Sequence, residues 1–203
     1  MDSQTLLLPA ARVDRWIANF GARHVGHTLS VTHGALTGMG GDGSTFEAHL
    51  PFGAAYDGPP EPAAFAAAMT APDVWGMLLV RKGGFAIARL TGEHIVESKV
   101  GQRHVQGRTK AGGQSQQRFA RRRGNQARQA YEAAAEHAAR ILGGVRSVVT
   151  GGDHAAVDEV LADRRLASLT VVEPWLPVPD PRRSVLEGAV RDACSVRMTV
   201  VNN

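Results

Sequence analysis

The sequence predicts an α/β (α+β) protein built on a mixed β-sheet, and three patterns carry that prediction. Three apolar segments between residues 74 and 100, joined by tight turns, predict an antiparallel three-strand meander. A helical repeat follows and stops at Gly143 and Gly144. Strand-like and helix-like segments then alternate, so we expect a βαβα arrangement with helices on the faces of the sheet.

The first 70 residues predict a separate helix and hairpin. Residues 12–20 have the apolar spacing of a short amphipathic helix, and alternating segments at residues 27–32 and 44–50 flank a glycine-rich turn. A proline-rich link leads to a small alanine-rich helix at residues 63–69. We expect residues 1–70 to form an extension packed on a core domain of residues 71–203, because 203 residues with 43% hydrophobic content suit one domain with a modest extension.

The core domain begins with the meander, whose strands are expected at residues 74–80, 85–90 and 94–100. The strand pattern ends at residues 105–111, which are mostly polar, and Gly112 and Gly113 follow, which predicts a protruding loop over about residues 101–117. The long helix is expected over about residues 115–142, with Ala134, Ala138 and Ile141 on its apolar face. Gly124 interrupts this helix at a cost of about 1 kcal/mol, so a bend or fraying is expected there.

The remaining elements alternate to the C-terminus. Strands are expected at residues 145–150, 166–172 and 196–201. Asp153 is the expected N-cap of a helix that runs to residue 162, and Asp180 and Pro181 begin a helix that runs to residue 193. Parallel strands joined through a helix cross over in the right-handed sense, which fixes the hand of this part of the fold.

The positive charge of the chain is concentrated in one stretch. Residues 99–129 contain no Asp or Glu and nine Lys and Arg. The other 14 Lys and Arg are outnumbered by 19 Asp and Glu, so the formal charge of +4 becomes −5 outside this stretch. A local cationic segment of this kind indicates contact with nucleic acid.

A glycine-rich motif lies inside the cationic stretch and begins the run GGQSQQRFARRR. This run resembles the conserved tip of the central domain of archaeal and eukaryotic class-I peptide release factors. In those proteins a loop of the form GxGGQ is followed by Ser, two variable residues, Arg-Phe-Ala-Arg, one variable residue and Arg. The matching positions are Gly112, Gly113, Gln114, Ser115, Arg118, Phe119, Ala120, Arg121 and Arg123. Lys110 stands where the family has the first glycine of its loop.

The resemblance covers about residues 73–193 and implies both a fold and an activity. The central domain of those factors has a ribonuclease-H-like fold, with the element order expected here. No segment resembles their codon-reading domain or their partner-binding third domain, so the chain is similar to the stand-alone Vms-like branch, which frees nascent chains from stalled ribosomes. The implied activity is a codon-independent peptidyl-tRNA hydrolase that cleaves the aminoacyl ester, with Gly112, Gly113 and Gln114 as the catalytic residues.

The cations around the motif have a separate expected role, which is to bind RNA phosphates. The expected RNA-binding residues are Arg108, Lys110, Ser115, Arg118, Arg121, Arg122, Arg123 and Arg128. The implied partners are the large ribosomal subunit, its rRNA and peptidyl-tRNA. Two alternatives stay open: a tRNA acceptor-end nuclease of the Vms-like type, and a non-catalytic ribosome- or RNA-binding protein that uses only the cationic helix.

Composition argues against several other classes of protein. The single Cys194 cannot form an internal disulfide, which favours a reducing compartment. No run approaches the roughly 18 apolar residues of a membrane span, and the N-terminal LLLPAA is too short for a signal sequence, so we expect a cytoplasmic protein. His94, His104, His137 and His154 lack metal-ligand spacing, so we expect no metal or other cofactor, and we expect a monomer.

Overall fold

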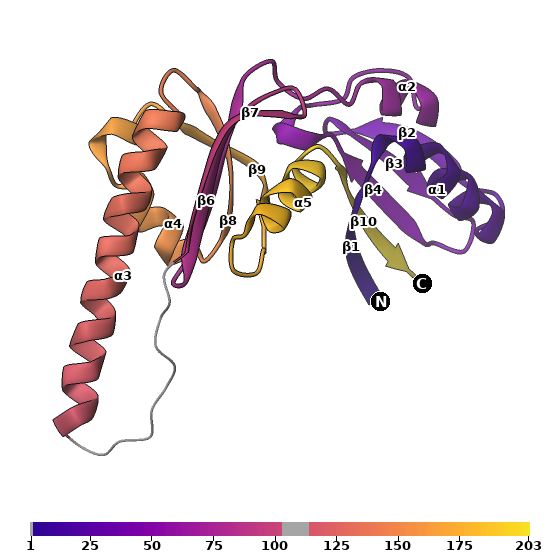
Figure 1. Cartoon of the computed structure of the whole chain (residues 1–203). Coiled ribbons are helices and arrows are strands. Elements are labelled where there is room, and N and C mark those ends of the chain that lie inside the picture. Colours follow the sequence, from indigo (N-terminus) through magenta and orange to yellow (C-terminus); the bar gives the residue numbers. More distant parts are fainter. Residues whose placement is uncertain (1, 103–113) are drawn as a thin grey trace. The chain divides into compact units, whose positions relative to one another are not determined.

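The computed structural model describes the backbone of residues 2–102 and 114–203, and the side chains of residues 3–101 and 128–203 (Figure 1). The chain forms two compact units. The terminal unit consists of Met1–Pro72 and Val190–Asn203, and the central unit consists of Asp73–Ala189. Each unit contains its own five-stranded sheet, so the mixed α and β composition predicted from the sequence is confirmed.

An antiparallel sheet forms the terminal unit. Its strand order is β1 (Asp2–Leu8), β10 (Val196–Asn202), β4 (Thr45–His49), β3 (Ala35–Met39) and β2 (Thr28–Thr32). Two helices, α1 (Ala10–Arg23) and α2 (Pro62–Ala67), and the short 3₁₀-helix η1 (Pro51–Gly53) complete the unit. Val13, Ile17 and Phe20 of α1 share one buried apolar cluster with sheet residues such as Phe46, so α1 covers one face of this sheet.

The hairpin predicted near the N-terminus is a set of three strands instead. His33 and Gly34 form a two-residue turn with φ angles of 51° and 76°, and β3 begins directly after it. The glycine-rich turn therefore joins β3 to β4. The sequence pattern missed β3 because a two-residue turn with two positive φ angles is most often signalled by Asn-Gly, and His is a weak signal for the first position.

The last strand of the chain corrects the predicted domain boundary. The strand expected at residues 196–201 forms as β10, but it lies in the terminal unit, between β1 and β4, and not in the domain of residues 71–203. Val196, Met198 and Val200 point to the side that carries the apolar cluster of this sheet. The pairing partner β1 lies almost two hundred residues earlier in the chain, and a local pattern carries no information about such a distant pairing.

The central unit contains the mixed sheet predicted from the sequence. In chain order its elements are β5 (Trp75–Arg81), β6 (Gly84–Thr91), β7 (His94–Gln102), α3 (Gln114–Ile141), β8 (Ser147–Gly152), α4 (His154–Leu161), the 3₁₀-helix η2 (Arg164–Leu166), β9 (Thr170–Leu176) and the start of α5 (Arg183–Ala193). The strand order is β7-β6-β5-β8-β9. The first three strands are antiparallel, and β8 and β9 run parallel to β5, which is the strand order and direction of a ribonuclease-H-like fold.

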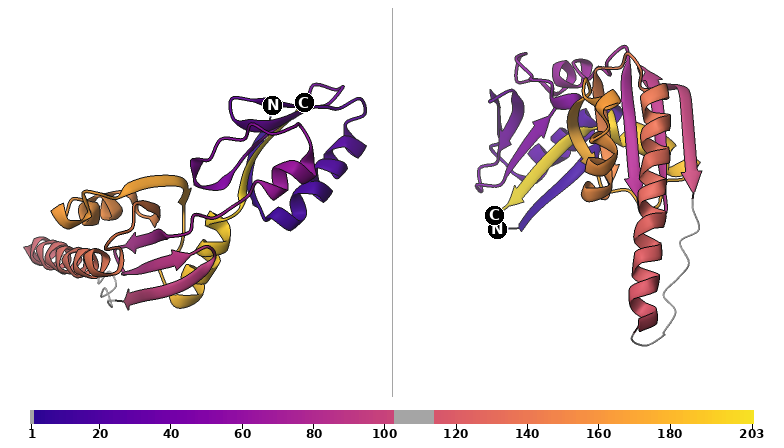
Figure 2. Two further views of the ribbon diagram at one scale, coloured as in Figure 1. Left: turned by 90° about the horizontal axis from the view of Figure 1, so that it is seen from above. Right: turned by 90° about the vertical axis from the view of Figure 1, so that its left-hand side faces the viewer.

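Helices cover both faces of the central sheet. Leu78 and Ile87 point to the face on which Ala138 of α3 and Val157 of α4 complete one buried cluster. Strand residues of the opposite parity, such as Met77, are also fully buried. Figures 1 and 2 show α5 on that second face, away from α3 and α4. Because β5 is buried on both faces, its near-continuous apolar sequence is explained.

The strand expected at residues 166–172 begins later than predicted. Leu166 belongs to η2, where it is buried in the central cluster, and β9 starts at Thr170. Asp163 caps η2 and accepts hydrogen bonds from the side chain and backbone N–H of Arg165, and these bonds lower the pKa of Asp163 to about 2. An apolar residue in a capped turn was therefore mistaken for the first residue of a strand.

Candidate functional site

The predicted catalytic and RNA-binding residues divide into three groups by position. Arg108, Lys110, Gly112 and Gly113 lie outside the described residues. Gln114 is the first residue of α3. Ser115, Arg118, Arg121, Arg122 and Arg123 follow along the first half of α3, where the structure describes the backbone alone. Arg128 is exposed.

The first half of the helix α3, from Gln114 on, extends away from the body of the central unit. We call residues 114–129 the stalk. Among the helix residues whose side chains are described, the first buried one is Ala130, which is 16 residues after Gln114. At 1.5 Å per residue, Gln114 stands about 24 Å along the helix axis from the point where α3 docks. Figures 1 and 2 show this half of the ribbon extending past the edge of the sheet.

The helix is assigned without a break from Gln114 to Ile141, so Gly124 lies within a continuous helix. A glycine here lowers helix stability but does not by itself end a helix, since the flanking residues keep their hydrogen bonds. The predicted start near residue 115 and end near residue 142 each agree with the structure to within one residue.

The second half of α3 fixes the stalk to the sheet. Ala134 and Ala138 are fully buried, and their small side chains allow the helix backbone to approach the strands closely. The ring of His137 lies 5.7 Å from the ring of Phe85 on β6, and Arg140 forms an ion pair with Glu97 on β7. The helix therefore contacts β6 and β7, the two strands directly before it, and these contacts set the direction of the stalk.

The elements before and after the glycine-rich motif are the strand β7 and the helix α3. The strand β7 ends at Gln102 and α3 begins at Gln114. In the right-hand view of Figure 2, the end of β7 and the stalk point the same way. The eleven positions between these two elements, which include Gly112 and Gly113, lie outside the described residues.

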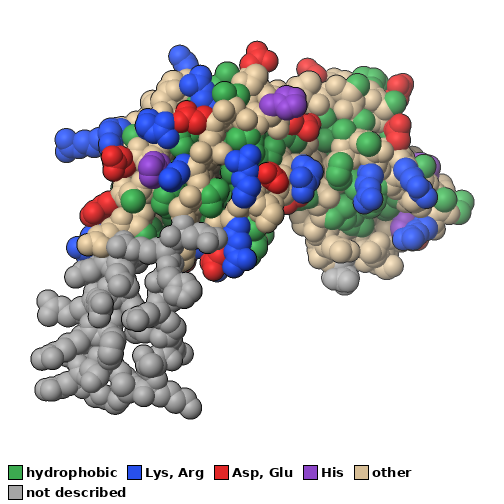
Figure 3. Space-filling model, viewed as in Figure 1, with side chains coloured by type: hydrophobic (Ala, Val, Ile, Leu, Met, Phe, Trp, Pro, Cys, Tyr) green, Lys and Arg blue, Asp and Glu red, His purple; other side chains and the backbone are tan. Residues whose placement is uncertain are grey.

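The described surface elsewhere carries mixed charge. In Figure 3, Lys and Arg side chains alternate with Asp and Glu over the face in view. Some exposed cations of the described residues have acidic partners, as Arg165 has in Asp163 and Arg183 has in Glu187. By the sequence count, residues outside 99–129 carry a formal charge of −5, so the excess of cations belongs to residues 99–129.

The described histidines named in the sequence analysis have different surroundings: His137 lies against Phe85, and His154 lies against Trp175. The ring of His154 stacks on Trp175 at 3.5 Å with an interplanar angle of 10°, while His94 is exposed at the start of β7. His104 lies outside the described residues. Over residues 3–101 and 128–203, whose side chains the structure describes, no three His, Cys, Asp or Glu side chains lie close enough together to hold a metal ion. Within the same residues, no helix is both long and apolar enough to cross a membrane.

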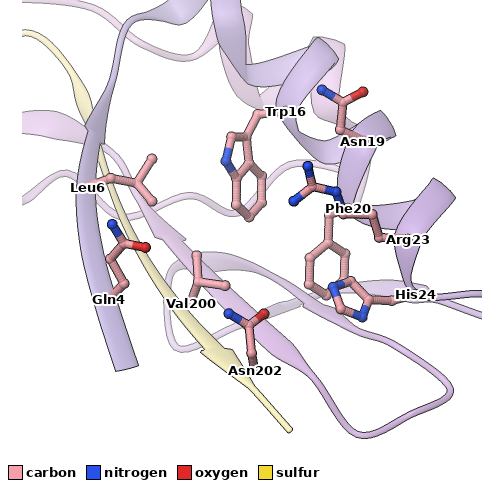
Figure 4. A pocket seen from close by; sticks show the side chains of 9 residues that line it. All are labelled: Gln4, Leu6, Trp16, Asn19, Phe20, Arg23, His24, Val200 and Asn202. Atoms are coloured by element: carbon pink, nitrogen blue, oxygen red, sulfur yellow. The ribbon is translucent and has the colours of Figure 1, made fainter. Parts of the chain in front are cut away.

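The terminal unit contains a pocket that the sequence analysis did not find. It lies between α1 and the strands β1 and β10, has a volume of about 240 Å³, and is lined in part by Trp16, Phe20 and Arg23 (Figure 4). The available signal was the spacing of Arg12, Trp16, Asn19 and Arg23, which places polar residues and a tryptophan on one side of a helix.

A family model matches this chain, and solved structures are similar to it. A family model described as "Actinobacteria/chloroflexi VLRF1 release factor" matches residues 73–199, starting at the first residue of that unit. The crystal structure of an archaeal translation termination factor, aRF1, is similar with a TM-score of 0.44 and 17% identity, over 78% of this chain and 47% of that one. A structure described as an archaeal protein is similar with a TM-score of 0.31 and 18% identity, over 76% of this chain and 50% of that one.

The chain thus spans about half the length of these two solved structures. No curated protein matches it. The family model covers well over half of the chain and includes the whole segment between β7 and α3. The chain belongs to the Vms-like release factor family of the Actinobacteria and Chloroflexi.

Proposed function

We propose that the protein is a ribosome-rescue peptidyl-tRNA hydrolase that releases nascent chains from stalled large subunits without reading a codon. The observation that supports this most directly is the position of Gln114 at the first residue of α3, about 24 Å along the helix axis from the docked half of α3. A release-factor motif at the outer end of a long helix suits insertion into a narrow RNA cavity. Membership of a release factor family supports the same reaction.

The chemistry requires little from the protein beyond the tip. Hydrolysis of the peptidyl-tRNA ester needs a water molecule held near the carbonyl carbon and hydrogen-bond donors for the developing oxyanion. Adjacent glycines allow backbone N–H groups to approach closely, because they carry no Cβ atom. In this proposal the backbone N–H of Gln114 donates to the oxyanion, and its neutral amide shapes the space for water without the desolvation cost of a charge.

The cations of the stalk supply affinity and orientation in this proposal. Arg118, Arg121, Arg122, Arg123 and Arg128 bind phosphates, and rRNA together with the tRNA end forms the rest of the cavity. These contacts act on binding, whereas the tip acts on the ester, so the two functions are separable by mutation.

Ribosome binding is expected to depend steeply on salt. If about five phosphates are neutralised, the logarithm of the association constant falls against the logarithm of salt concentration with a slope of roughly −3.5 to −4.5. Titration of the protein against 50S subunits between low and physiological salt measures this slope. Replacing Arg121 by Gln is expected to make the slope shallower by about one unit. Binding that does not change with salt would contradict a phosphate-binding stalk.

Two other readings lead to different products. A nuclease acting near the tRNA acceptor end also frees the peptide, but it leaves a shortened tRNA. A protein that only binds RNA through the stalk releases nothing. All three readings place the chain on RNA, so analysis of the products is needed to separate them.

The deciding experiment incubates the protein with purified 50S or 70S particles that carry labelled peptidyl-tRNA, and analyses both products. We expect free peptide together with tRNA whose terminal CCA is intact. A tRNA with a shortened 3′ end would show that the protein cleaves the tRNA and does not hydrolyse the ester. Stable binding to the particles without any release of peptide would support the alternative of a non-catalytic ribosome- or RNA-binding protein.

A further inference from the structure

We propose that the terminal unit binds an unpaired nucleobase of single-stranded RNA in the pocket between α1 and the β1–β10 pair. The pocket lies in a different unit from the stalk, and it involves none of the residues used in the proposed release reaction. The choice of RNA over DNA rests on the proposed function, since a chain that works at the ribosome meets RNA. The site itself is argued from the residues of the terminal unit alone.

One side of α1 is built from residue types that bind nucleic acid. With 100° between successive residues, Arg12, Arg15, Trp16, Asn19 and Arg23 fall within a sector of about 100°. The buried residues of α1 occupy the neighbouring sector, and its one acidic residue, Asp14, lies on the far side of the helix. Three guanidinium groups, an indole and an amide therefore share one surface without a carboxylate of their own helix.

The pocket is formed where this surface meets the sheet. Figure 4 shows Trp16 and Phe20 from α1 facing Leu6 of β1 and Val200 of β10, which together give apolar walls. The indole of Trp16 is half-buried and is held in place by Phe20, at a ring distance of 5.9 Å, and by the edge contact with Phe46 at 5.4 Å. An aromatic ring that is fixed in this way presents a flat apolar surface at little cost in entropy.

Amide groups surround the apolar walls. Gln4, Asn19 and Asn202 line the pocket, and each amide offers both a donor and an acceptor. The heterocyclic edge of a nucleobase carries the same mixture of donors and acceptors, whereas an aliphatic side chain or a lipid tail carries none. The pocket volume of about 240 Å³ lies below the roughly 300–1,000 Å³ of typical small-molecule sites, which suits a single base.

His24 closes one end of the pocket in a fixed orientation. Its Nδ1 lies 2.8 Å from Oδ2 of Asp42, and the pKa of that carboxyl group is lowered by a hydrogen bond from the backbone N–H of Ser44 and by His24 itself. Because the carboxylate accepts, Nδ1 carries the proton. The Nε2 atom of the ring is then the one that remains for a bound molecule.

Arginines continue from the pocket along the helix. A shallower hollow of about 420 Å³ shares Trp16 and Asn19 with the pocket and is lined by Arg12 and Arg15. Within the part of the chain that the structure describes, neither these two residues nor Arg23 forms an ion pair. No acidic residue lines either hollow among the described residues. A base in the pocket therefore has cations on both sides for the phosphates that flank it, which is how proteins bind single strands.

The test uses the full chain with Arg118, Arg121, Arg122 and Arg123 replaced by Gln, so that the stalk contributes little to binding. Fluorescence anisotropy measures the affinity for labelled single-stranded RNA ten-mers, for a blunt RNA duplex, for single-stranded DNA of the same sequence and for poly-glutamate. We expect single-stranded RNA to bind best. A duplex or poly-glutamate that binds equally well would reduce the surface to a general anion site and overturn the proposal, and a clear preference for DNA would overturn the choice of RNA.

Substitutions then locate the binding site. Trp16→Leu is expected to weaken RNA binding by about 10-fold, and Trp175→Leu in the central unit, which is also partly exposed, is expected to change it less than 2-fold. Asn19 is exposed, so Asn19→Leu tests the site without disturbing the core, and a several-fold loss is expected. Arg23→Gln is compared in the same way with Arg146→Gln.

Photo-crosslinking gives a readout that does not depend on mutation. RNA that contains 4-thiouridine is expected to crosslink to peptides from α1, and crosslinks confined to the central unit would contradict the proposal. These assays need neither ribosomes nor an ester substrate. A failure here leaves the release reaction standing, and a protein without release activity still gives the RNA-binding result if the pocket acts as proposed.

Discussion

Replacing Gly113 by Ala is expected to slow peptide release by about 100-fold or more, while binding to the ribosome changes less than 2-fold. The methyl group obstructs close approach of the backbone to the ester, and an L-residue resists the positive φ angles that glycine adopts freely. Loss of one well-placed oxyanion donor typically costs a factor of 10² to 10³ in rate, and the expected loss follows from that value. Single-turnover release of labelled peptide from 50S particles measures the rate, and co-sedimentation measures binding.

Gly143→Ala is the matched control for this experiment. Gly143 lies just beyond the opposite end of α3, and an added Cβ atom there meets its nearest neighbours, Ala139 O and Arg140 O, at 3.4 and 3.6 Å, which is ordinary van der Waals contact. We expect Gly143→Ala to release peptide at the rate of the unchanged protein. If Gly113→Ala releases peptide at the full rate while the control also behaves normally, the motif of Gly112, Gly113 and Gln114 does not take part in the reaction as proposed.

Replacing Ala138 by Asp is expected to lower the free energy of unfolding of the central unit by about 4 kcal/mol. Ala138 is fully buried where α3 packs on the sheet, in a cluster of apolar side chains. A buried carboxyl group without a partner is among the most destabilising changes known, against a total stability of roughly 5–15 kcal/mol for a domain. Release activity is expected to fall with it, because the stalk loses its attachment.

Urea unfolding is followed by tryptophan fluorescence in a Trp16→Phe background, so that the remaining Trp75 and Trp175 report on the central unit. Ala155→Asp serves as the control, since Ala155 is exposed in the first turn of α4, where a negative charge interacts favourably with the helix dipole. We expect the control to unfold at or slightly above the urea concentration of the unchanged protein. Equal stability of the two variants would mean that α3 is not anchored through Ala138.

Patterns within single elements predicted much of the central unit. The near-continuous apolar run of β5, the tight turns of the meander and the apolar spacing of Ala134, Ala138 and Ile141 are local properties, and they predicted the meander and the long helix with nearly correct ends. The Asp153 N-cap was also predicted from sequence, and its side chain accepts from the backbone N–H of Ala156. The family match over residues 73–199 confirms the resemblance that the motif first indicated.

For the candidate site too, some features were predicted from the sequence and others were seen only in the structure. The identity of the tip and the excess of cations around it are sequence properties, because they depend on which residues follow one another. The roles of Gly112, Gly113 and Gln114 and of the stalk cations stay predictions. The pocket of the terminal unit was not foreseen, because Gln4, Trp16 and Asn202 come together only when both ends of the chain enter one sheet.

The sequence by itself thus determined the meander, the long helix, the cationic stretch and the family, since each is written in neighbouring residues or in a fixed helical or strand period. Only the tertiary structure decided that β10 joins β1 and β4, that α3 docks from Ala130 onward, and that α1 closes a pocket against the β1–β10 pair. The physical reason is that strand pairing and helix docking are selected by the burial of apolar surface across the whole chain, and this selection leaves no local pattern to read.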